Sequence, residues 1–293
     1  MHRISIIGAG TVGTAMGFLL KECGYSIVGI GSRTLESAKK AREFIGEGEA
    51  SVDLKTIAKK AEIVFITTSD GAIEEVCNKL ASEGGFNAGT VVFHMSGALP
   101  SEVLGSARNS GASIASIHPL QSLADVNEAT KNLHGSYFCI EGDEIAISVA
   151  RKIVKSLNGK EITLDVSKKP LYHAGAAVVS NFLVATIGFG LALYEAAGIN
   201  RQDSLKALMP LIKGTVKNIE SLGIPSALTG PISRGDAGIV ESHLKAISKA
   251  MPETIRLYSE LGRCTVKIAL DKGTIKESDA EKIFSLFDKY AIK

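Results

Sequence analysis

Three glycines near the N-terminus have the spacing that binds a pyrophosphate. A short apolar run, Ile4–Ile7, leads into Gly8-Ala9-Gly10-Thr11-Val12-Gly13 and then into a helical pattern. In such a G-x-G-x-x-G motif the first glycine permits a sharp turn, the second lets backbone amides approach the phosphates, and the third lets helix and strand pack closely. The helix N-terminus favours negative charge through its unpaired N–H groups. The sequence therefore predicts a dinucleotide site at residues 8–13.

The end of the second predicted strand indicates which dinucleotide is bound. An NAD site usually has Asp or Glu here, which accepts hydrogen bonds from the ribose 2′-hydroxyl. This chain has Ser32, Arg33 and Thr34, and the next carboxylate is Glu36. Arginine makes charge-assisted hydrogen bonds with phosphate oxygens, which suits a 2′-phosphate. We therefore predict NADP(H); the alternative is that Arg33 is a solvated surface residue and Thr34 only caps the next helix.

Polar residues follow the fourth, fifth and sixth predicted strands, where an α/β sheet holds its ligands. Thr67, Thr68 and Ser69 are predicted to line the path of the cofactor, and Ser96 to lie near the nicotinamide. Hydride transfer to a carbonyl or imine also requires a proton donor and groups that stabilise negative charge. His118 is a candidate, because the proline after it disfavours a helix and places the imidazole where the strand ends. The alternative is a structural histidine bonded to backbone.

A second group of candidates lies in the second half of the chain. His173 and Asn181 are eight residues apart on one predicted helix, so they are separated by about 12 Å along its axis and can border one pocket without gripping the same atom. Asn181 in an apolar helix requires a paired amide, which means an inter-helix hydrogen bond or a substrate contact. Arg234 lies in a glycine-rich loop, where it either binds a substrate carboxylate or is an ordinary loop residue.

The composition is that of a globular protein rather than a nucleic-acid-binding one. The 293 residues carry a net charge of +2, without basic runs. The four cysteines have no metal-binding spacing; Cys23, Cys77 and Cys139 are expected to be buried free thiols, and the chain to be cytoplasmic. Residues 174–194 carry no charge and are long enough to cross a membrane. We favour a helix buried within a domain or between subunits, because the segment also contains polar residues and glycines.

The first half of the chain alternates strand and helix patterns, which is typical of a Rossmann-type, doubly wound, mainly parallel sheet of the α/β class. The predicted strands are Ile4–Ile7, Ser26–Ile30, Ala50–Val52, Ile63–Thr67, Thr90–His94, Ser113–Ile117, Ser136–Ile140 and Glu161–Leu164. The predicted helices between them are Val12–Cys23, Leu35–Ile45, Leu54–Lys60, Ile73–Glu83, Pro100–Asn109 and Glu144–Leu157.

After Leu164 the pattern is entirely helical. The predicted helices are Pro170–Ala197, Arg201–Leu222, Gly238–Ala250, a helix from Pro252 to Leu261 or beyond, and Asp279–Tyr290. We therefore predict an NADP-binding Rossmann domain over residues 1–165 and a helical substrate and dimerisation domain over residues 166–293, with a catalytic cleft between them.

Four motifs together resemble a known family. They are H-M-S-G at 94–97, I-H-P-L-Q-S at 117–122, Y-H-A-G with the later S-N at 172–181, and A-L-T-G-P-I-S-R-G-D at 227–236. The family joins a Rossmann-like domain to a helical domain of long-unassigned function, and the resemblance covers essentially the whole chain. Its wider relatives are the β-hydroxyacid dehydrogenases, ketopantoate reductases and pyrroline-5-carboxylate reductases. The resemblance implies a helical C-terminal domain similar to that of 6-phosphogluconate dehydrogenase, a nicotinamide cofactor, a small carboxylate-bearing substrate and a homodimer formed through the helical domains.

The resemblance also implies roles for individual residues. Ser96 matches a serine near the nicotinamide. The loop from Pro119 to Ser122, which includes Gln121, matches a loop that holds the substrate carboxylate. Asn181, which follows Ser180, matches the asparagine of a K-x-x-x-N helix motif. The lysine of that motif, which donates a proton or stabilises an oxyanion, is replaced by Ala177.

The missing lysine leaves the proton donor to be assigned. Lys168 and Lys169 precede position 177 by eight residues or more, and we expect neither to replace the lysine. A histidine, His173 or His118, is then expected to donate the proton.

Three functions remain open. The first is NADPH-dependent reduction of a small 2-oxo acid, with ketopantoate (2-dehydropantoate) as the specific candidate. The second is reduction of an imine, as in the pyrroline-5-carboxylate reductases, which need less proton donation at the reacting centre. The third is a non-catalytic NADPH-binding sensor, which the missing lysine favours.

Overall fold

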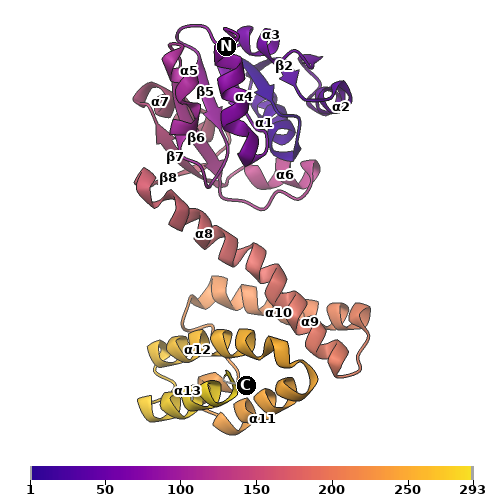
Figure 1. Ribbon diagram of the computed structural model, residues 1–293, viewed down its shortest axis with the longest axis vertical. Helices are drawn as coiled ribbons and strands as arrows, with labels where there is room; N and C mark the ends of the chain where they lie inside the picture. The colour runs from indigo at the N-terminus through magenta and orange to yellow at the C-terminus, as the bar shows by residue number, and fades with distance from the viewer. Residues whose placement is uncertain (1, 292–293) are drawn as a thin grey trace. The chain divides into compact units, whose positions relative to one another are not determined.

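The computed structural model describes residues 2–291 and contains one eight-stranded sheet in the order β3-β2-β1-β4-β5-β6-β7-β8 (Figure 1). β1 to β6 are parallel, β7 is antiparallel to β6, and β8 is parallel to β7. The strands are β1 Arg3–Ile7, β2 Ser26–Gly31, β3 Glu49–Ser51, β4 Ile63–Ile66, β5 Val91–His94, β6 Ser113–Pro119, β7 Tyr137–Gly142 and β8 Lys160–Thr163. The predicted α/β class with a mainly parallel sheet is confirmed.

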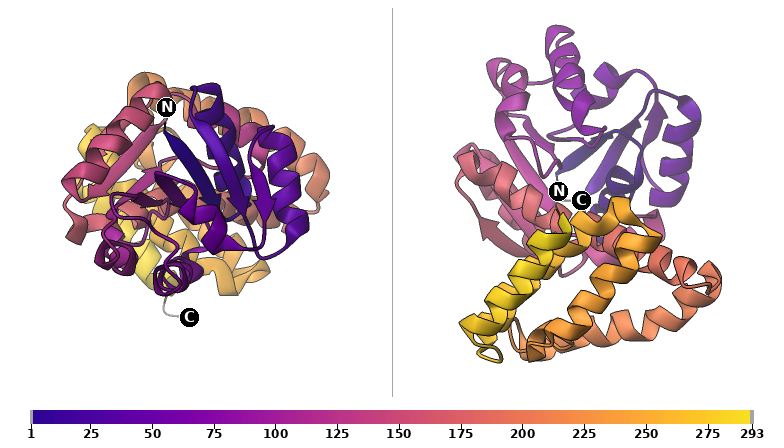
Figure 2. Two further views of the ribbon diagram at one scale, coloured as in Figure 1. Left: turned by 90° about the horizontal axis from the view of Figure 1, so that it is seen from above. Right: turned by 60° about the horizontal axis from the view of Figure 1, so that its bottom comes forward.

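Apolar residues on both faces bury this sheet between two helical layers (Figure 2). Because successive side chains of a strand point to opposite faces, Phe65 and Phe93 join one core while Val64 and Val92 join the other. This double burial explains why the strands read as nearly continuous β-branched and aromatic runs. The helices of this part are α1 Thr11–Glu22, α2 Leu35–Ile45, α3 Leu54–Lys59, α4 Asp70–Ser82, η1 Ser101–Leu104, α5 Gly105–Asn109, α6 Val126–Leu133 and α7 Glu144–Ser156.

Two local expectations in this part are corrected by the structure. Helix α6 was not predicted, although the side chain of Asp125 caps it by accepting from the N–H groups of Asn127 and Glu128. Cys23 is exposed rather than buried, because it lies at the C-cap one residue beyond α1. Cys77 and Cys139 are buried free thiols as expected.

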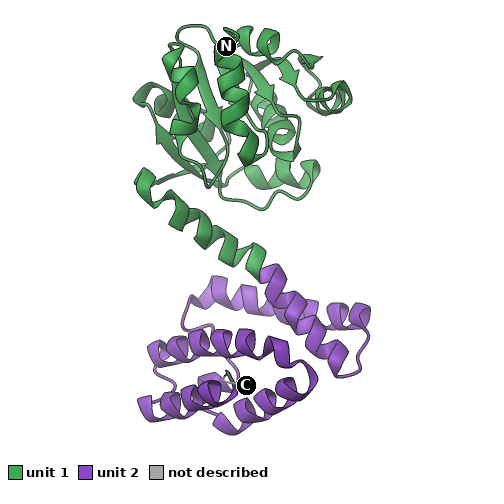
Figure 3. Ribbon diagram, viewed as in Figure 1, with its two compact units in different colours: residues 1–182 green, residues 183–293 purple. Residues whose placement is uncertain are grey.

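The chain divides into two compact units, residues 1–182 and 183–293 (Figure 3). The sequence placed the boundary at 165/166, where the strand pattern ends. The structure keeps the next helical segments, η2 Val166–Lys168 and α8 Lys169–Val179, with the sheet unit. The reason is visible in its contacts, since Lys169 is buried against β6 and β7 and Tyr172 is hydrogen-bonded to His118.

Unit 2 is helical and has a core of its own. Its α11, α12 and α13 pack around Val240, Leu244, Val266 and Phe287. The helices from α9 onward are α9 Asn181–Ala196, whose first two residues belong to unit 1, α10 Arg201–Leu222, η3 Ile232–Arg234, α11 Ala237–Ala250, η4 Pro252–Thr254, α12 Ile255–Lys272 and α13 Glu277–Ala291.

The apolar helical run predicted over Pro170–Ala197 is interrupted and exposed. It is divided at Ser180 into α8 and α9, and only 6% of its most apolar window is buried within the chain. Among the described residues, Val166–Ala196 is the one segment long and apolar enough to cross a membrane, judged by length and composition alone. The expectation that it is buried within its own domain is wrong. Its burial between subunits stays a prediction.

Candidate functional site

The glycine motif forms a tight turn between β1 and α1. Gly8 has a φ of +116°, and a Cβ atom there would lie 2.6 Å from the carbonyl carbon of Thr67. A Cβ on Gly13 would lie 2.3 Å from the carbonyl oxygen of Gly8 and from Oγ1 of Thr67. Both positions therefore require glycine for close packing. A Cβ on Gly10, by contrast, would meet no atom within 4 Å.

Gly10 faces an open pocket of about 370 Å³ that lies wholly within unit 1. Helix α1 begins here at Thr11, and no side chain caps its first turn, so its N–H groups are free to bind an anion. In addition, Oγ1 of Thr68 is buried without a hydrogen-bond partner in the part of the chain that the structure describes. An anionic ligand with further hydrogen-bonding groups therefore fits the pocket. Of the predicted cofactor residues, the pocket is lined by Gly8, Ala9, Gly10, Ser32, Arg33, Thr67, Thr68 and Ser69.

Other predicted cofactor residues shape this site without lining the pocket. Thr11, Val12 and Gly13 form the first turn of α1. Thr34 is the N-cap of α2, where its Oγ1 accepts from the N–H of Ser37, as in the structural alternative. Thr67, which does line the pocket, also supports the turn, because its hydroxyl donates to the carbonyl oxygen of Gly8 at 2.8 Å.

The end of the pocket at β2 carries a positive charge. Arg33 is exposed there and makes no ion pair among residues 2–291, and no carboxylate lines the pocket. The nearest acidic residue along the chain, Glu36, is paired with Lys40 at 2.7 Å on the surface of α2. This end of the pocket therefore suits a phosphate better than a ribose diol.

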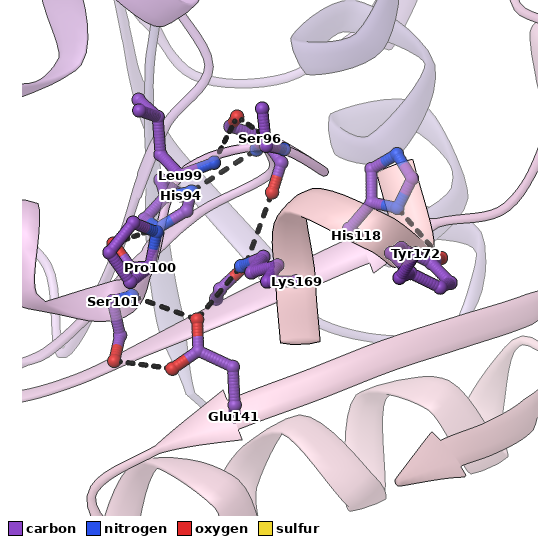
Figure 4. A network of polar contacts seen from close by, with 11 residues as sticks. His94, Ser96, Leu99, Pro100, Ser101, His118, Glu141, Lys169 and Tyr172 are labelled. Carbon is purple, nitrogen blue, oxygen red and sulfur yellow. Dashed lines mark hydrogen bonds and ion pairs between the residues drawn. The ribbon is translucent and has the colours of Figure 1, made fainter. Parts of the chain in front are cut away.

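A row of buried polar side chains crosses the same sheet farther along. His94 on β5 is in register with Ser116 on β6, and Ser116 is in register with Glu141 on β7. All three are buried and point to the face that carries Val92 and Ile114. Lys169, at the start of α8, covers this row: its Nζ donates to Oε1 of Glu141 at 2.8 Å and to Oγ of Ser116 at 2.5 Å (Figure 4).

This polar row holds the loop that follows β5. Nδ1 of His94 accepts from the N–H of Ser96 at 3.1 Å, so its Nε2 carries the proton and donates to the carbonyl oxygen of Pro100 at 3.2 Å. The carboxylate of Glu141 accepts from the backbone N–H and the hydroxyl of Ser101 at 2.8 and 2.6 Å. Oγ of Ser96 accepts from two backbone N–H groups, at Ala98 and Leu99, which leaves its hydroxyl proton for another acceptor.

Two histidines meet the tip of this loop. A Cβ on Gly97 would lie 2.6 Å from Nε2 of His118 and 2.8 Å from Cδ2 of His173. The two imidazole rings are 6.2 Å apart between centroids. Nδ1 of His118 is hydrogen-bonded to the hydroxyl of Tyr172 at 2.9 Å, whereas His173 is partly exposed and has no hydrogen-bond partner within residues 2–291.

Burial decides the protonation of this cluster. It lowers the pKa of His94 and of His118 to about 4, and the positive charge of Lys169 acts in the same direction on both. Both imidazoles are therefore neutral at pH 7. Burial also raises the pKa of the Tyr172 phenol, so that the hydroxyl keeps its proton. The buried ammonium of Lys169 has a lowered pKa for the same reason, opposed by its hydrogen bond to Glu141.

The predicted substrate residues are not gathered at this cluster. The amide of Gln121 is bound by the carbonyl oxygen of Asn132, in α6, and by Oγ of Ser136, directly before β7. Ser180 and Asn181 are exposed at the break between α8 and α9 in the single chain. An inter-helix hydrogen bond or a substrate contact of the Asn181 amide therefore stays a prediction. Ser122 lies beside Gln121, and Arg234 lies in unit 2. The roles assigned to these residues stay predictions.

Sequence reasoning missed the residues that hold the cluster together. It set Lys169 aside because of its distance from position 177, and it gave Ser116, Glu141 and Tyr172 no role. One signal was present: Lys169, Tyr172 and His173 are spaced i, i+3 and i+4, which places them on one face of a helix.

A Rossmann-like domain model matches residues 2–119, and the model described as a domain of unknown function, DUF2520, matches residues 136–265. A solved protein from Thermotoga maritima is 30% identical with a TM-score of 0.72, over 92% of this chain and 99% of that one. The chain belongs to the Rossmann–DUF2520 family. The predicted family of unassigned function is thereby confirmed.

More distant solved structures share the fold of this Rossmann–DUF2520 protein. A protein from Bacteroides fragilis, assigned as an NADP oxidoreductase, has a TM-score of 0.74 at 22% identity, over 91% of this chain and 98% of that one. An imine reductase from Pseudomonas sp. has a TM-score of 0.56 at 17% identity, over 97% and 91%. No curated protein sequence matches the chain.

Proposed function

We propose that this Rossmann–DUF2520 protein is an NADPH-dependent oxidoreductase that reduces a small 2-oxo acid, with 2-dehydropantoate as the specific candidate. One observation carries the proposal: the dinucleotide pocket and the histidine cluster lie along the same edge of one sheet. The pocket is at the carboxyl ends of β1, β2 and β4, and the cluster at those of β5 and β6. Ligands of open α/β sheets bind at this edge.

The chain's own residues supply what a carbonyl reduction needs besides the hydride, which bound NADPH provides. Tyr172 keeps its proton, and we assign its hydroxyl as the donor in the hydrogen bond to Nδ1 of His118. With this assignment the proton of the neutral His118 ring lies on Nε2, the atom that faces Gly97. His118 then stabilises a developing negative charge on oxygen as a neutral N–H donor. His173 has free ring nitrogens and access to solvent, and it transfers the proton that completes the alcohol.

The charge of the cluster favours a carbonyl substrate over an iminium. Hydride transfer to a carbonyl builds negative charge on oxygen, which N–H and O–H donors stabilise. An iminium starts with a positive charge, which a free carboxylate would stabilise. Within the described chain, the carboxylate hydrogen-bonded into this cluster is that of Glu141, and it is already paired with Lys169. The carboxylate of Asp70 lies at the exposed start of α4 and acts on His94 and Lys169 through its charge, without a hydrogen bond to either. Arg234 is our candidate for the substrate carboxylate.

A substrate panel tests the function. The purified protein is incubated with NADPH and either small 2-oxo acids, including 2-dehydropantoate, or cyclic imines, including pyrroline-5-carboxylate. We expect loss of the absorbance of the reduced nicotinamide with a 2-oxo acid and formation of the matching 2-hydroxy acid. Turnover of imines alone would replace the proposal by an imine reductase. Tight NADPH binding without turnover would replace it by a binding protein.

Replacing His173 by asparagine is expected to lower kcat about 100-fold, which is the lower range for loss of a general acid. The Kd for NADPH should not change, because His173 lies outside the dinucleotide pocket. Steady-state kinetics and a fluorescence titration with NADPH measure the two effects. The matched control is His134→Asn, at the end of α6, which removes a histidine outside the cluster. A wild-type kcat in His173→Asn would show that another group transfers the proton.

Arg33→Ala is expected to weaken NADPH binding by about 10- to 100-fold, the effect of losing a hydrogen bond between charged groups. NADH lacks the 2′-phosphate, so its Kd should stay the same. Lys39→Ala is the control, because it removes one positive charge from the exposed surface of α2, outside the pocket. Equal losses of NADPH and NADH affinity in Arg33→Ala would rule out recognition of the 2′-phosphate by this residue.

A further inference from the structure

The proposed reaction leaves the buried Lys169–Glu141 ion pair without a role. The side chains of Lys169 and Glu141 are 1% and 5% exposed, so both charges have lost their hydration. Such a pair costs as much in desolvation as it gains in attraction, and apolar residues of similar volume would be at least as stable. Stability alone therefore does not account for a lysine and a glutamate at these positions.

The pair joins two segments that are far apart in the sequence. Glu141 holds Ser101, at the far end of the loop after β5, through the backbone N–H and the hydroxyl. Lys169 also binds Ser116, whose hydroxyl donates to the carbonyl oxygen of Ser96 at 3.3 Å, near the beginning of that loop. The ion pair thus fixes the loop near both ends, and its lysine is the first residue of α8 (Figure 4).

Both segments carry the groups of the proposed site. The loop carries Ser96 and Gly97, and α8 carries Tyr172 and His173 one turn after Lys169. Gly97 approaches His118, which belongs to β6, and His173, which belongs to α8. The loop therefore contacts both of these elements through Gly97. A shift of α8 along the sheet would move His173 and, through Tyr172, change the hydrogen bond that orients His118.

We propose that Lys169 and Glu141 are positioning residues that set the distance between the Ser96–Gly97 loop and the Tyr172–His173 turn. This inference rests on the proposed reductase function. The pair touches neither the dinucleotide pocket nor solvent, so it acts on catalysis through the groups it places. Loss of the pair lowers kcat, because small displacements of catalytic groups are costly, and leaves NADPH binding unchanged.

The test compares single and paired substitutions. Lys169→Met alone leaves the Glu141 charge buried and unpaired, and the thermal midpoint should fall by about 10 °C. In Lys169→Met/Glu141→Gln no charge is left, so the midpoint should return to within a few degrees of wild type. We expect this double variant to bind NADPH normally and to show a kcat about 10- to 30-fold lower. The control, Arg151→Met/Glu161→Gln, removes an exposed ion pair between α7 and β8 and should leave kcat unchanged.

Amide hydrogen exchange gives a readout that does not depend on turnover. In the double variant the N–H groups of Ser96 and Ser101 should exchange at least 10-fold faster, while β1 and β4 keep their protection. If the wild-type protein reduces no substrate, the proposed function fails and this exchange result still decides the positioning role. Wild-type kcat together with unchanged exchange in the double variant would overturn the inference. Equal thermal midpoints for the single and double variants would overturn the pairing itself.

Discussion

Alanine at Gly10 is expected to weaken NADPH binding about 100-fold while the thermal midpoint stays within about 2 °C of wild type. The added methyl group would meet no protein atom within 4 Å, so the fold has no reason to change. It would instead occupy the space in front of the uncapped first turn of α1. A pyrophosphate held away from these N–H groups loses one or two charged hydrogen bonds, each worth about 1.5–3 kcal/mol.

Gly13→Ala is the matched comparison, because it adds the same methyl group three residues later. Here the methyl would lie 2.3 Å from the backbone oxygen of Gly8, which cannot move as a side chain can. We expect NADPH binding to fall and the free energy of unfolding to drop by about 3 kcal/mol, at the upper end of ordinary overpacking. Thermal melts and NADPH titrations of both variants separate the two effects. Normal NADPH affinity in Gly10→Ala would contradict the assignment of the pocket.

Lowering the pH is expected to destabilise the protein at pH values well above those at which its carboxylates become protonated. Burial lowers the pKa of His94 from 6.5 to about 4, and the positive charge of Lys169 adds to this. Below pH 6.5 the unfolded chain therefore binds a proton that the folded chain does not bind until about pH 4. The stability that His94 contributes by staying neutral is fully present above pH 6.5 and is lost as the pH falls from 6.5 towards 4. The difference of about 2.5 pH units corresponds to about 3 kcal/mol at pH 4. His118 contributes in the same direction.

Urea unfolding of the wild type and of His94→Asn between pH 7.5 and 4 measures this effect. The amide oxygen of asparagine can accept the N–H of Ser96 in place of Nδ1, but it does not titrate. We expect the variant to lose less stability than the wild type between pH 6.5 and 4. Parallel curves for the two proteins would show that His94 is protonated as readily in the folded protein as in the unfolded chain.

The sheet and the glycine turn between β1 and α1 were predictable because each depends on local sequence. Buried parallel strands need runs such as Ile63–Ile66, and the turn at Gly8 needs a residue that tolerates positive φ. The elements that sequence reasoning missed depend on weaker signals. α6 is only two turns long, with an Asp125 cap and two buried residues, Ala129 and Leu133. The break at Ser180 interrupts an otherwise continuous apolar pattern.

The polar cluster was harder to predict because it depends on register. The row of His94, Ser116 and Glu141 forms only when β5, β6 and β7 pair in the observed register. One of these strands, β7, runs antiparallel to β6. Periodicity indicates which face a residue takes, but it does not indicate which residue of the next strand lies beside it. The role of Lys169 was missed for the same reason, since its partners lie 28 and 53 residues earlier.

The reversal of β7 and β8 has a consequence for the order in which the chain folds. Lys169 follows both reversed strands in the sequence. Its contacts with Ser116 and Glu141 therefore close chain loops of 53 and 28 residues that end in α8. Contacts of this kind form late, because the entropy of the closed loop is lost before they stabilise it. During synthesis, β1 to β6 can pair before the lysine has emerged, and until then water hydrates the carboxylate of Glu141. Completion of the histidine cluster is thus expected to be among the final events of folding in unit 1.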